Sequence, residues 1–169
     1  MRSAEVTIEL LLASPHSRYE GRPGDGPLPA TAVELHEEIE IRAGLGVVGD
    51  RYFAKAAHKA ASVTLMAMES LELVAADLGL EAIPDAAATR RNIMLRGFPV
   101  DELRGVEFTL DSGHGAVRFR GNRPANPCAW MDVVLAPGAF RALRGRGGIR
   151  CEPLTSGRLS LGPATLTVD

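Results

Sequence analysis

Alternating and β-branched hydrophobic positions divide most of the chain into short segments that predict β-strands. Residues 6–13 (VTIELLLA) are rich in such side chains, and residues 32–44 place Val33, Leu35, Ile39 and Ile41 at alternate positions. Further strands are predicted at residues 61–67, 91–95, 106–111 and 116–121, and short strands are predicted within residues 151–168. Residues 14–31, rich in proline and glycine, predict a long loop after the first strand.

One segment has a clear helical period. Leu71, Val74, Ala75 and Leu78 follow the i, i+3, i+4, i+7 spacing of an amphipathic helix. The acidic residues of this segment occupy its other face: Glu69, Glu72 and Asp77. Gly79 is a typical C-terminal stop. A shorter helix is predicted from Pro137 to about Arg144, before a run of glycines.

Together these elements predict a mainly β protein. Many short strands limited by turns, with one clear helix, are typical of a β-barrel-like or sandwich domain with peripheral helices. No alternation of strands and helices supports a doubly wound parallel sheet. At 169 residues the chain is expected to form a single domain, residues 1–169, with a core that needs no disulfides.

Composition and charge narrow the range of partners. The formal net charge of −2 argues against nucleic acid as a partner. The N-terminal apolar run is short and interrupted by glutamate, so no membrane span or signal peptide is expected, and the protein is placed in the cytoplasm with reduced thiols. Lysine occurs only at Lys55 and Lys59, and every other cation is arginine. A GC-rich genome explains this bias, and so does recognition of anions by the planar guanidinium.

The segment GLGVVG, residues 44–49, matches the GxGxxG pattern of dinucleotide-binding proteins. That pattern binds pyrophosphate only where a helix opens at the glycines, and the following residues do not predict such a helix. No NAD is therefore expected. The segment is instead interpreted as a glycine-bearing turn that presents Asp50 and Arg51.

Two arginine-containing segments are candidates for anion binding. In TRRNI, residues 89–93, an extended backbone would place Arg90 and Asn92 on one face, which suits an anionic or heterocyclic ligand. In RGRGGIR, residues 144–150, Arg146 lies beside glycines that allow close backbone approach and an anion-binding nest. On these residues alone, solvated surface arginines are the simpler explanation of both segments.

The two cysteines differ in context. Cys151 lies on a predicted strand between apolar neighbours, which is typical of a buried and inert thiol. Cys128 follows two prolines in RPANPC, a segment that cannot be an ordinary strand, with Asn126 as a neighbouring donor. Arginines near a thiol favour the reactive thiolate. The four histidines lack the spacing of zinc ligands, so no zinc site is expected.

The order of these motifs resembles the MOSC family, named for the C-terminal domain of molybdenum cofactor sulfurases. The matching segments, which span about residues 33–166, are GVVGDRYF, SVTLMAMES, TRRNI, NPCAWM and GRGGIRCEPLTSGRLSLGPA. The resemblance implies a strongly bent, mostly antiparallel β-barrel, as in the barrel of pyruvate kinase, with peripheral helices. The chain looks like a stand-alone bacterial member of the family.

The resemblance also implies a cofactor and its ligands. In molybdenum-containing relatives a cysteine at the position of Cys128 ligates the metal of the molybdopterin cofactor. Carried over by position, the cofactor-binding residues are Asp50, Arg51, Arg90, Asn92, Asn126 and Arg146. A soft thiolate suits molybdenum, and arginines suit the phosphate of the cofactor. A role for pyridoxal phosphate is not expected, because the lysine-bearing domain of the sulfurases has no counterpart here.

Three functions agree with the sequence. Cys128 would ligate molybdenum in an oxidoreductase that reduces a small N-oxygenated substrate, with a separate redox partner because the chain has no cysteine set for an iron–sulfur cluster. Alternatively, Cys128 would carry a persulfide in sulfur transfer. The third possibility is a cofactor carrier or binding module without catalysis.

Overall fold

The computed structural model describes all residues, 1–169, and its central element is a closed β-barrel. The strands of the barrel run in the order β1-β10-β6-β7-β8-β4-β5. Their bounds are β1 (Arg2–Leu11), β4 (Val63–Ala67), β5 (Ile93–Arg96), β6 (Glu107–Asp111), β7 (Val117–Pro124), β8 (Ile149–Pro153) and β10 (Gly162–Val168). Closure of the barrel pairs every strand on both sides and leaves no open edge. The predicted mainly β fold with a barrel and peripheral helices is confirmed.

All neighbouring strands of the barrel are antiparallel except β4 and β5, which pair in parallel. A parallel pair needs a crossover connection. Helix α1 (Met68–Leu78) and the 3-10 helix η3 (Ala86–Thr89) lie in that connection. A smaller sheet, β3-β2-β9, is formed by β2 (Glu38–Arg42), β3 (Gly46–Val47) and β9 (Gly157–Ser160).

Helix α1 confirms the predicted helical period. Leu71, Val74 and Ala75 are buried, and Gly79 ends the helix with φ of +65° in the left-handed conformation. Its apolar face packs on the outside of the barrel, where the outward side chains of Met66 and Met94 from β4 and β5 are buried with it. Two short helices complete this layer: α2 (Trp130–Val134) and α3 (Ala139–Ala142). α3 lies within the short helix predicted from Pro137 to about Arg144, and α2 was not predicted.

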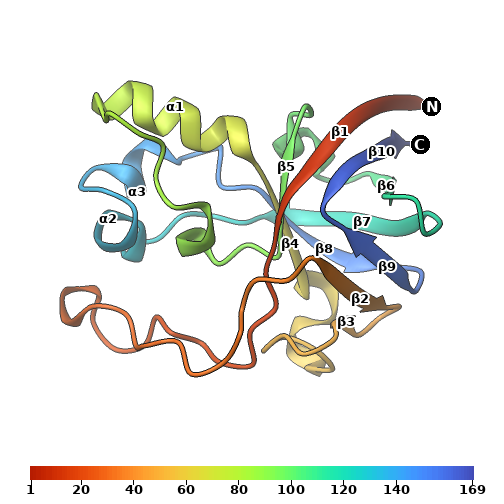
Figure 1. Cartoon of the computed structure of the whole chain (residues 1–169), viewed down its shortest axis with the longest axis horizontal. Helices are drawn as coiled ribbons and strands as arrows, with labels where there is room; N and C mark the ends of the chain where they lie inside the picture. Colours follow the sequence, from red (N-terminus) through yellow and green to blue (C-terminus); the bar gives the residue numbers. More distant parts are fainter.

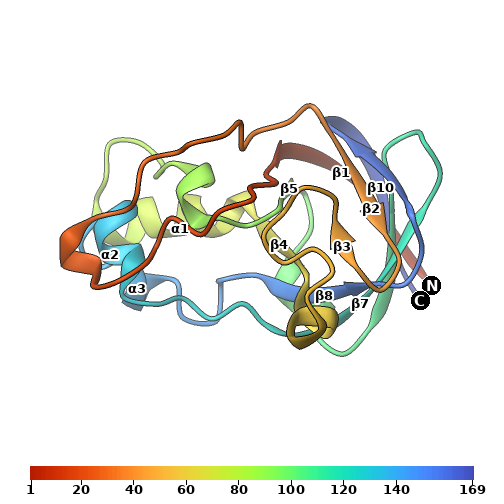
Figure 2. The same ribbon diagram turned by 90° about the horizontal axis from the view of Figure 1, so that it is seen from below.

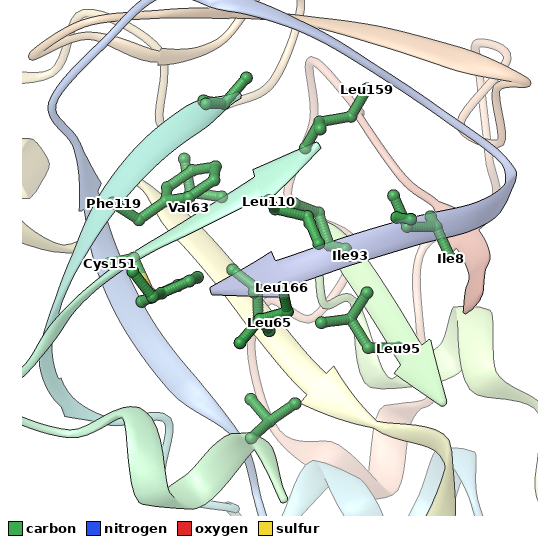
Figure 3. Close-up of a cluster of buried hydrophobic side chains, with 14 of the residues drawn as sticks. Ile8, Val63, Leu65, Ile93, Leu95, Leu110, Phe119, Cys151, Leu159 and Leu166 are labelled. Atoms are coloured by element: carbon green, nitrogen blue, oxygen red, sulfur yellow. The ribbon is translucent and has the colours of Figure 1, made fainter. Parts of the chain in front are cut away.

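The interior of the barrel is filled by apolar side chains from all of its strands. Figure 3 shows these side chains gathered between the strands, with Cys151 among them. Phe108 and Phe119 stack on paired strands with ring centroids 5.4 Å apart. This interior is closed by side chains, so a functional site must lie at the rim or on the outer face of the barrel.

The segment before β2 differs from its prediction. A strand was predicted over 32–44, but β2 covers only Glu38–Arg42. Residues before it bond to the end of β1, since the Ala13 N–H donates to Glu34 O and the His36 N–H donates to Leu11 O. No layer covers this crossing, so Val33 stays 74% exposed. The alternation was therefore a misleading signal in this part of the segment.

The helices α2 and α3 lie at the end of the molecule opposite the chain termini (Figure 1). The long loop 14–31, which contains the 3-10 helix η1 (Pro23–Asp25), extends to the same end and passes beside α2 (Figure 2). Two further 3-10 helices, η2 (Ala56–Ala61) and η4 (Val100–Leu103), lie against the barrel. None of the helices combines the length and apolar character that crossing a membrane requires.

Candidate functional site

The two cysteines lie in opposite environments. Cys151 on β8 is fully buried in the barrel interior, and this burial raises the pKa of its thiol. Cys128 lies in the connection between β7 and α2 and is exposed. Its carbonyl accepts a hydrogen bond from the Met131 N–H at 3.0 Å, which fixes the backbone at the start of α2. Cys128 is therefore the thiol that a ligand or metal can reach.

Arg91 is the charged group that marks the site beside Cys128. Its side chain is only 7% exposed, and its guanidinium donates to three backbone carbonyls: Gly147 O at 2.9 Å, Thr89 O at 3.1 Å and Ala125 O at 3.0 Å. No carboxylate bonds to it. A buried cation is normally paired with an anion, because removing a charge from water is costly. Arg91 thus creates a place where a bound anion is strongly favoured.

Neighbouring charged groups and burial both change the pKa of Arg91. This pKa is lowered to about 10, chiefly by burial and next by the nearby charge of Arg150. A negative charge on Cys128 acts in the opposite direction, and Arg51 and Tyr52 also contribute. Arg91 still carries its charge near neutral pH. Cys128, Arg150, Arg51 and Tyr52 therefore surround Arg91 closely enough to interact with it electrostatically, and we call these five residues the Arg91 cluster.

Arg150 reaches the cluster because of strand alternation. Ile149 and Cys151 point into the barrel interior, so the intervening Arg150 points outward. It lies opposite Thr64 on β4 and Arg123 on β7. The side chains of Arg150 and Arg123 make no hydrogen bond and no ion pair within the chain. Arg150 was not singled out as a ligand from the sequence.

Asp50 and Arg51 come from the turn after β3. GLGVVG does not begin a helix, as predicted, but it is not a single turn, because its middle residues form β3 between two turns. The Asp50 side chain is fully buried and accepts hydrogen bonds from the backbone of Ser14 and Tyr52 and from Arg51. The Arg51 guanidinium lies 4.5 Å from the centre of the Tyr52 ring. Asp50 therefore positions Arg51, and Arg51 is the member of the pair that faces the cluster.

The predicted pairing of Arg90 with Asn92 on one face is wrong. Arg90 has φ of +61° at the end of η3, so the segment is not extended and the alternation fails there. The guanidinium of Arg90 donates to the Glu34 carboxylate and to His16 O. Burial alone would raise the pKa of Glu34, but the hydrogen bonds from Arg90 and Ser14 and the charges of Arg90 and Arg18 together outweigh it, and the pKa is lowered. Arg90 thus holds the long loop against η3.

Asn92 is 1% exposed, and its side chain makes hydrogen bonds that hold the fold together. Its side-chain oxygen accepts from the N–H and the hydroxyl of Thr64, at 2.9 and 3.1 Å, and its amide donates to Leu12 O at 3.0 Å. These bonds tie β4 to the end of β1 where β5 begins. Asn92 therefore has no free polar atom for the cofactor-binding role implied by the resemblance.

Arg146 and Asn126, the two remaining predicted ligands, lie in environments unlike those of Arg90 and Asn92. Arg146 ion-pairs with Asp77 of α1 at 2.9 Å, so its side chain points away from the Arg91 cluster. Asn126 is exposed, makes no side-chain hydrogen bond, and lies two residues before Cys128. The glycines after Arg146 serve close packing: a Cβ on Gly147 would lie 2.2 Å from Ala125 O, and one on Gly148 would lie 2.1 Å from Leu65 O.

Aromatic residues form the boundary of the site toward the long loop. Tyr19 of this loop stacks on Trp130 of α2, with ring centroids 5.0 Å apart. On the side of η2, a hollow of about 500 Å³ is lined by side chains that include Arg51, Tyr52, Lys55 and His58. The cations of this hollow continue the positive charge of the Arg91 cluster. Carboxylates are absent from its lining.

Comparisons with known proteins show the fold. The chain is similar to the YuaD protein from Bacillus subtilis, with a TM-score of 0.72 and 17% identity over 99% of this chain and 98% of that one. It is also similar to YiiM from Escherichia coli, with a TM-score of 0.61 and 14% identity over 96% of this chain and 69% of that one. YiiM from Geobacillus stearothermophilus aligns with 64% of this chain and 54% of its own, at 19% identity and a TM-score of 0.52.

Both YuaD and YiiM are MOSC-domain proteins, so these similarities support a MOSC-like fold. No family model matches the chain. No curated protein matches it either.

Proposed function

We propose that this chain binds the molybdenum cofactor at the Arg91 cluster and reduces an N-oxygenated substrate with electrons from a separate donor. The observation that carries the proposal is the buried Arg91, bonded only to backbone carbonyls, beside the exposed Cys128. The MOSC-like fold agrees with it.

The residues of the cluster fit the chemistry of this cofactor. Its phosphate is an anion that needs arginine donors, and Arg91, Arg150 and Arg51 would hold it. Its metal is already bound by soft sulfur atoms, and the Cys128 thiolate would add another ligand of the same kind. No group of three or more His, Cys, Asp or Glu side chains lies together in the chain. A metal at Cys128 would therefore bring other ligands with it.

When bound, the cofactor supplies a metal that changes oxidation state and accepts an oxygen atom. The chain's own residues would bind and orient. Arg91 is rigid, because three backbone carbonyls fix its guanidinium, so it would set the direction of the bound anion relative to Cys128. Reduction of an N-hydroxyl group takes up an electron pair and protons and releases the oxygen as water. Two cysteines are too few to ligate an iron–sulfur cluster, so the electrons would come from a separate redox partner.

Measurement of the pterin content of the purified protein tests the proposal. The chain is produced in a host that makes the cofactor, and pterin and molybdenum are measured for wild type, Arg91→Gln and Arg141→Gln. Arg141 is an exposed arginine of α3 and serves as the matched control. The expected result is loss of pterin, by about tenfold or more, in Arg91→Gln alone. A wild-type protein without pterin and molybdenum would overturn the proposal.

Sulfur transfer is the second candidate, and the exposure of Cys128 near the buried Arg91 favours it. A thiolate at this position would attack a sulfane donor, form a persulfide, and pass the outer sulfur to an acceptor thiolate. Intact mass spectrometry after incubation with a sulfane donor would show one added sulfur at Cys128. An unchanged mass, or an adduct only at Cys151, would contradict this function.

A further inference from the structure

A second hollow lies where α1 begins beside the end of β5, and Arg146 is the one predicted ligand in its lining. Its volume is about 390 Å³. The polar side chains of its lining are Glu69, Ser70, Asp101 and Arg146, and its apolar ones include Leu73 and Phe98. The sequence placed Glu69 on the solvated face of α1, and the structure instead turns it into this hollow.

One polar atom in the hollow lacks a partner within the protein. Glu69 Oε1 accepts the Gly97 N–H at 2.8 Å, but its second oxygen, Oε2, is buried without a hydrogen-bond partner. Ser70, which follows it in the chain and also lines the hollow, is 4% exposed. Buried polar atoms are normally satisfied, so the unpartnered carboxylate oxygen calls for a hydrogen-bond donor from outside the chain.

The charge of the hollow is negative. Asp101 Oδ1 accepts the Gly148 N–H at 2.9 Å, and no cation pairs with its carboxylate. Burial raises the pKa of Asp101, although the bond from Gly148 and the nearby charge of Arg91 act in the opposite direction. Arg146 is the cation of the lining, but Asp77 already binds it. The carboxylates of Glu69 and Asp101 are therefore left without an ion-pair partner.

We propose that this hollow binds a small organic cation, a primary ammonium carried on an apolar group. The ammonium would donate to Glu69 Oε2, the Ser70 hydroxyl and the Asp101 carboxylate, which matches its three N–H donors. The apolar group would lie against Leu73 and Phe98. An apolar cavity of about 150 Å³ already holds a benzene ring, so this hollow has room for a ring and a short chain.

The apolar lining distinguishes this ligand from a metal ion. Divalent cations prefer several oxygen ligands and retain water, whereas this hollow offers two carboxylates among apolar side chains. No residue of the Arg91 cluster lines the hollow, although Arg91 lies near enough to Asp101 for its charge to lower the pKa of that carboxyl. The turn at Gly147 and Gly148 lies between them, since Gly147 O accepts from Arg91 and the Gly148 N–H donates to Asp101.

The test is a titration of the full chain with phenethylammonium chloride, followed by amide NMR. The amides of Gly97 and Gly148 donate directly to the proposed ligand carboxylates, so their resonances should shift with ligand concentration. Phenethyl alcohol has the same apolar group and no charge, and phenylpropionate carries the opposite charge. The ammonium is expected to bind at least about tenfold more tightly than the alcohol, and phenylpropionate is not expected to bind.

Variants locate the site. Glu69→Gln and Asp101→Asn keep the oxygens that accept from Gly97 and Gly148 but remove the negative charges, and each should weaken ammonium binding about tenfold. Glu81→Gln removes an exposed carboxylate beyond the other end of α1 and should leave binding unchanged.

Equal affinities for the ammonium and the alcohol in the wild type would overturn the proposal, and so would unchanged Gly97 and Gly148 resonances. The wild-type comparison decides the matter even where a variant fails to fold. Equal binding by a folded Glu69→Gln variant and the wild type would also contradict it.

Discussion

Replacement of Asn92 by alanine tests whether this residue stabilises the fold or serves only to bind a ligand. Asn92 is 1% exposed, and its side chain satisfies the Thr64 N–H and the Leu12 carbonyl, both buried. Alanine leaves these two groups without partners. Each buried polar group left unsatisfied costs about 1–3 kcal/mol, so Asn92→Ala should lower the free energy of unfolding by about 4 kcal/mol.

The expected loss is large on the scale of protein stability. In a domain of this size, 1 kcal/mol corresponds to roughly 2–4 °C in Tm, so the Tm should fall by about 8–16 °C. Thermal unfolding followed by circular dichroism measures it. Asn122→Ala is the matched control, because Asn122 makes one exposed hydrogen bond, to Ala60 O at 2.7 Å. A Tm of Asn92→Ala within about 3 °C of the control would refute the assigned role of Asn92.

Three further predictions concern the loop and the thiols. Tyr19→Ala removes the stack on Trp130, the only tryptophan, so the emission of Trp130 should move to longer wavelength; unchanged emission would contradict the stack. Glu34→Gln should reduce stability to urea near neutral pH, and this loss should shrink as the pH falls through the lowered pKa of Glu34, because the carboxylate then becomes protonated in the folded protein; a loss that stays equal down to acid pH would contradict it. Iodoacetamide should alkylate Cys128 in the native protein and Cys151 only after denaturation, as mass spectrometry would show; native labelling of Cys151 would contradict its burial.

Local patterns predicted much of the fold. The spacing of Leu71, Val74 and Ala75 predicts α1 because a helix on the outside of a barrel buries one narrow face. Cys151 was interpreted as a buried strand residue, and it lies in the interior with Ile149 two positions before it. Val33, by contrast, alternates like a strand residue and is exposed, because burial depends on a covering layer that the local pattern does not encode.

The candidate site was harder to predict than the fold. Arg91 was passed over because an extended backbone would place its neighbours Arg90 and Asn92 together and point Arg91 elsewhere. The left-handed conformation of Arg90 breaks that alternation, and nothing in its sequence signals it, since residues other than glycine rarely adopt positive φ. Arg146 was assigned to the site from its glycines, but its ion pair with Asp77 depends on where α1 packs. These features are set by tertiary contacts.

Molybdenum content of the Cys128→Ala variant tests the central claim most directly. The claim is that an exposed thiolate beside the buried Arg91 holds the metal of a bound cofactor. Wild type, Cys128→Ala and the control Cys151→Ala are purified from a host that makes the cofactor, and the ratio of molybdenum to folded protein is measured. The account predicts molybdenum in wild type and in Cys151→Ala, and a clear loss in Cys128→Ala. Equal molybdenum in Cys128→Ala and wild type, or none in wild type, would contradict it.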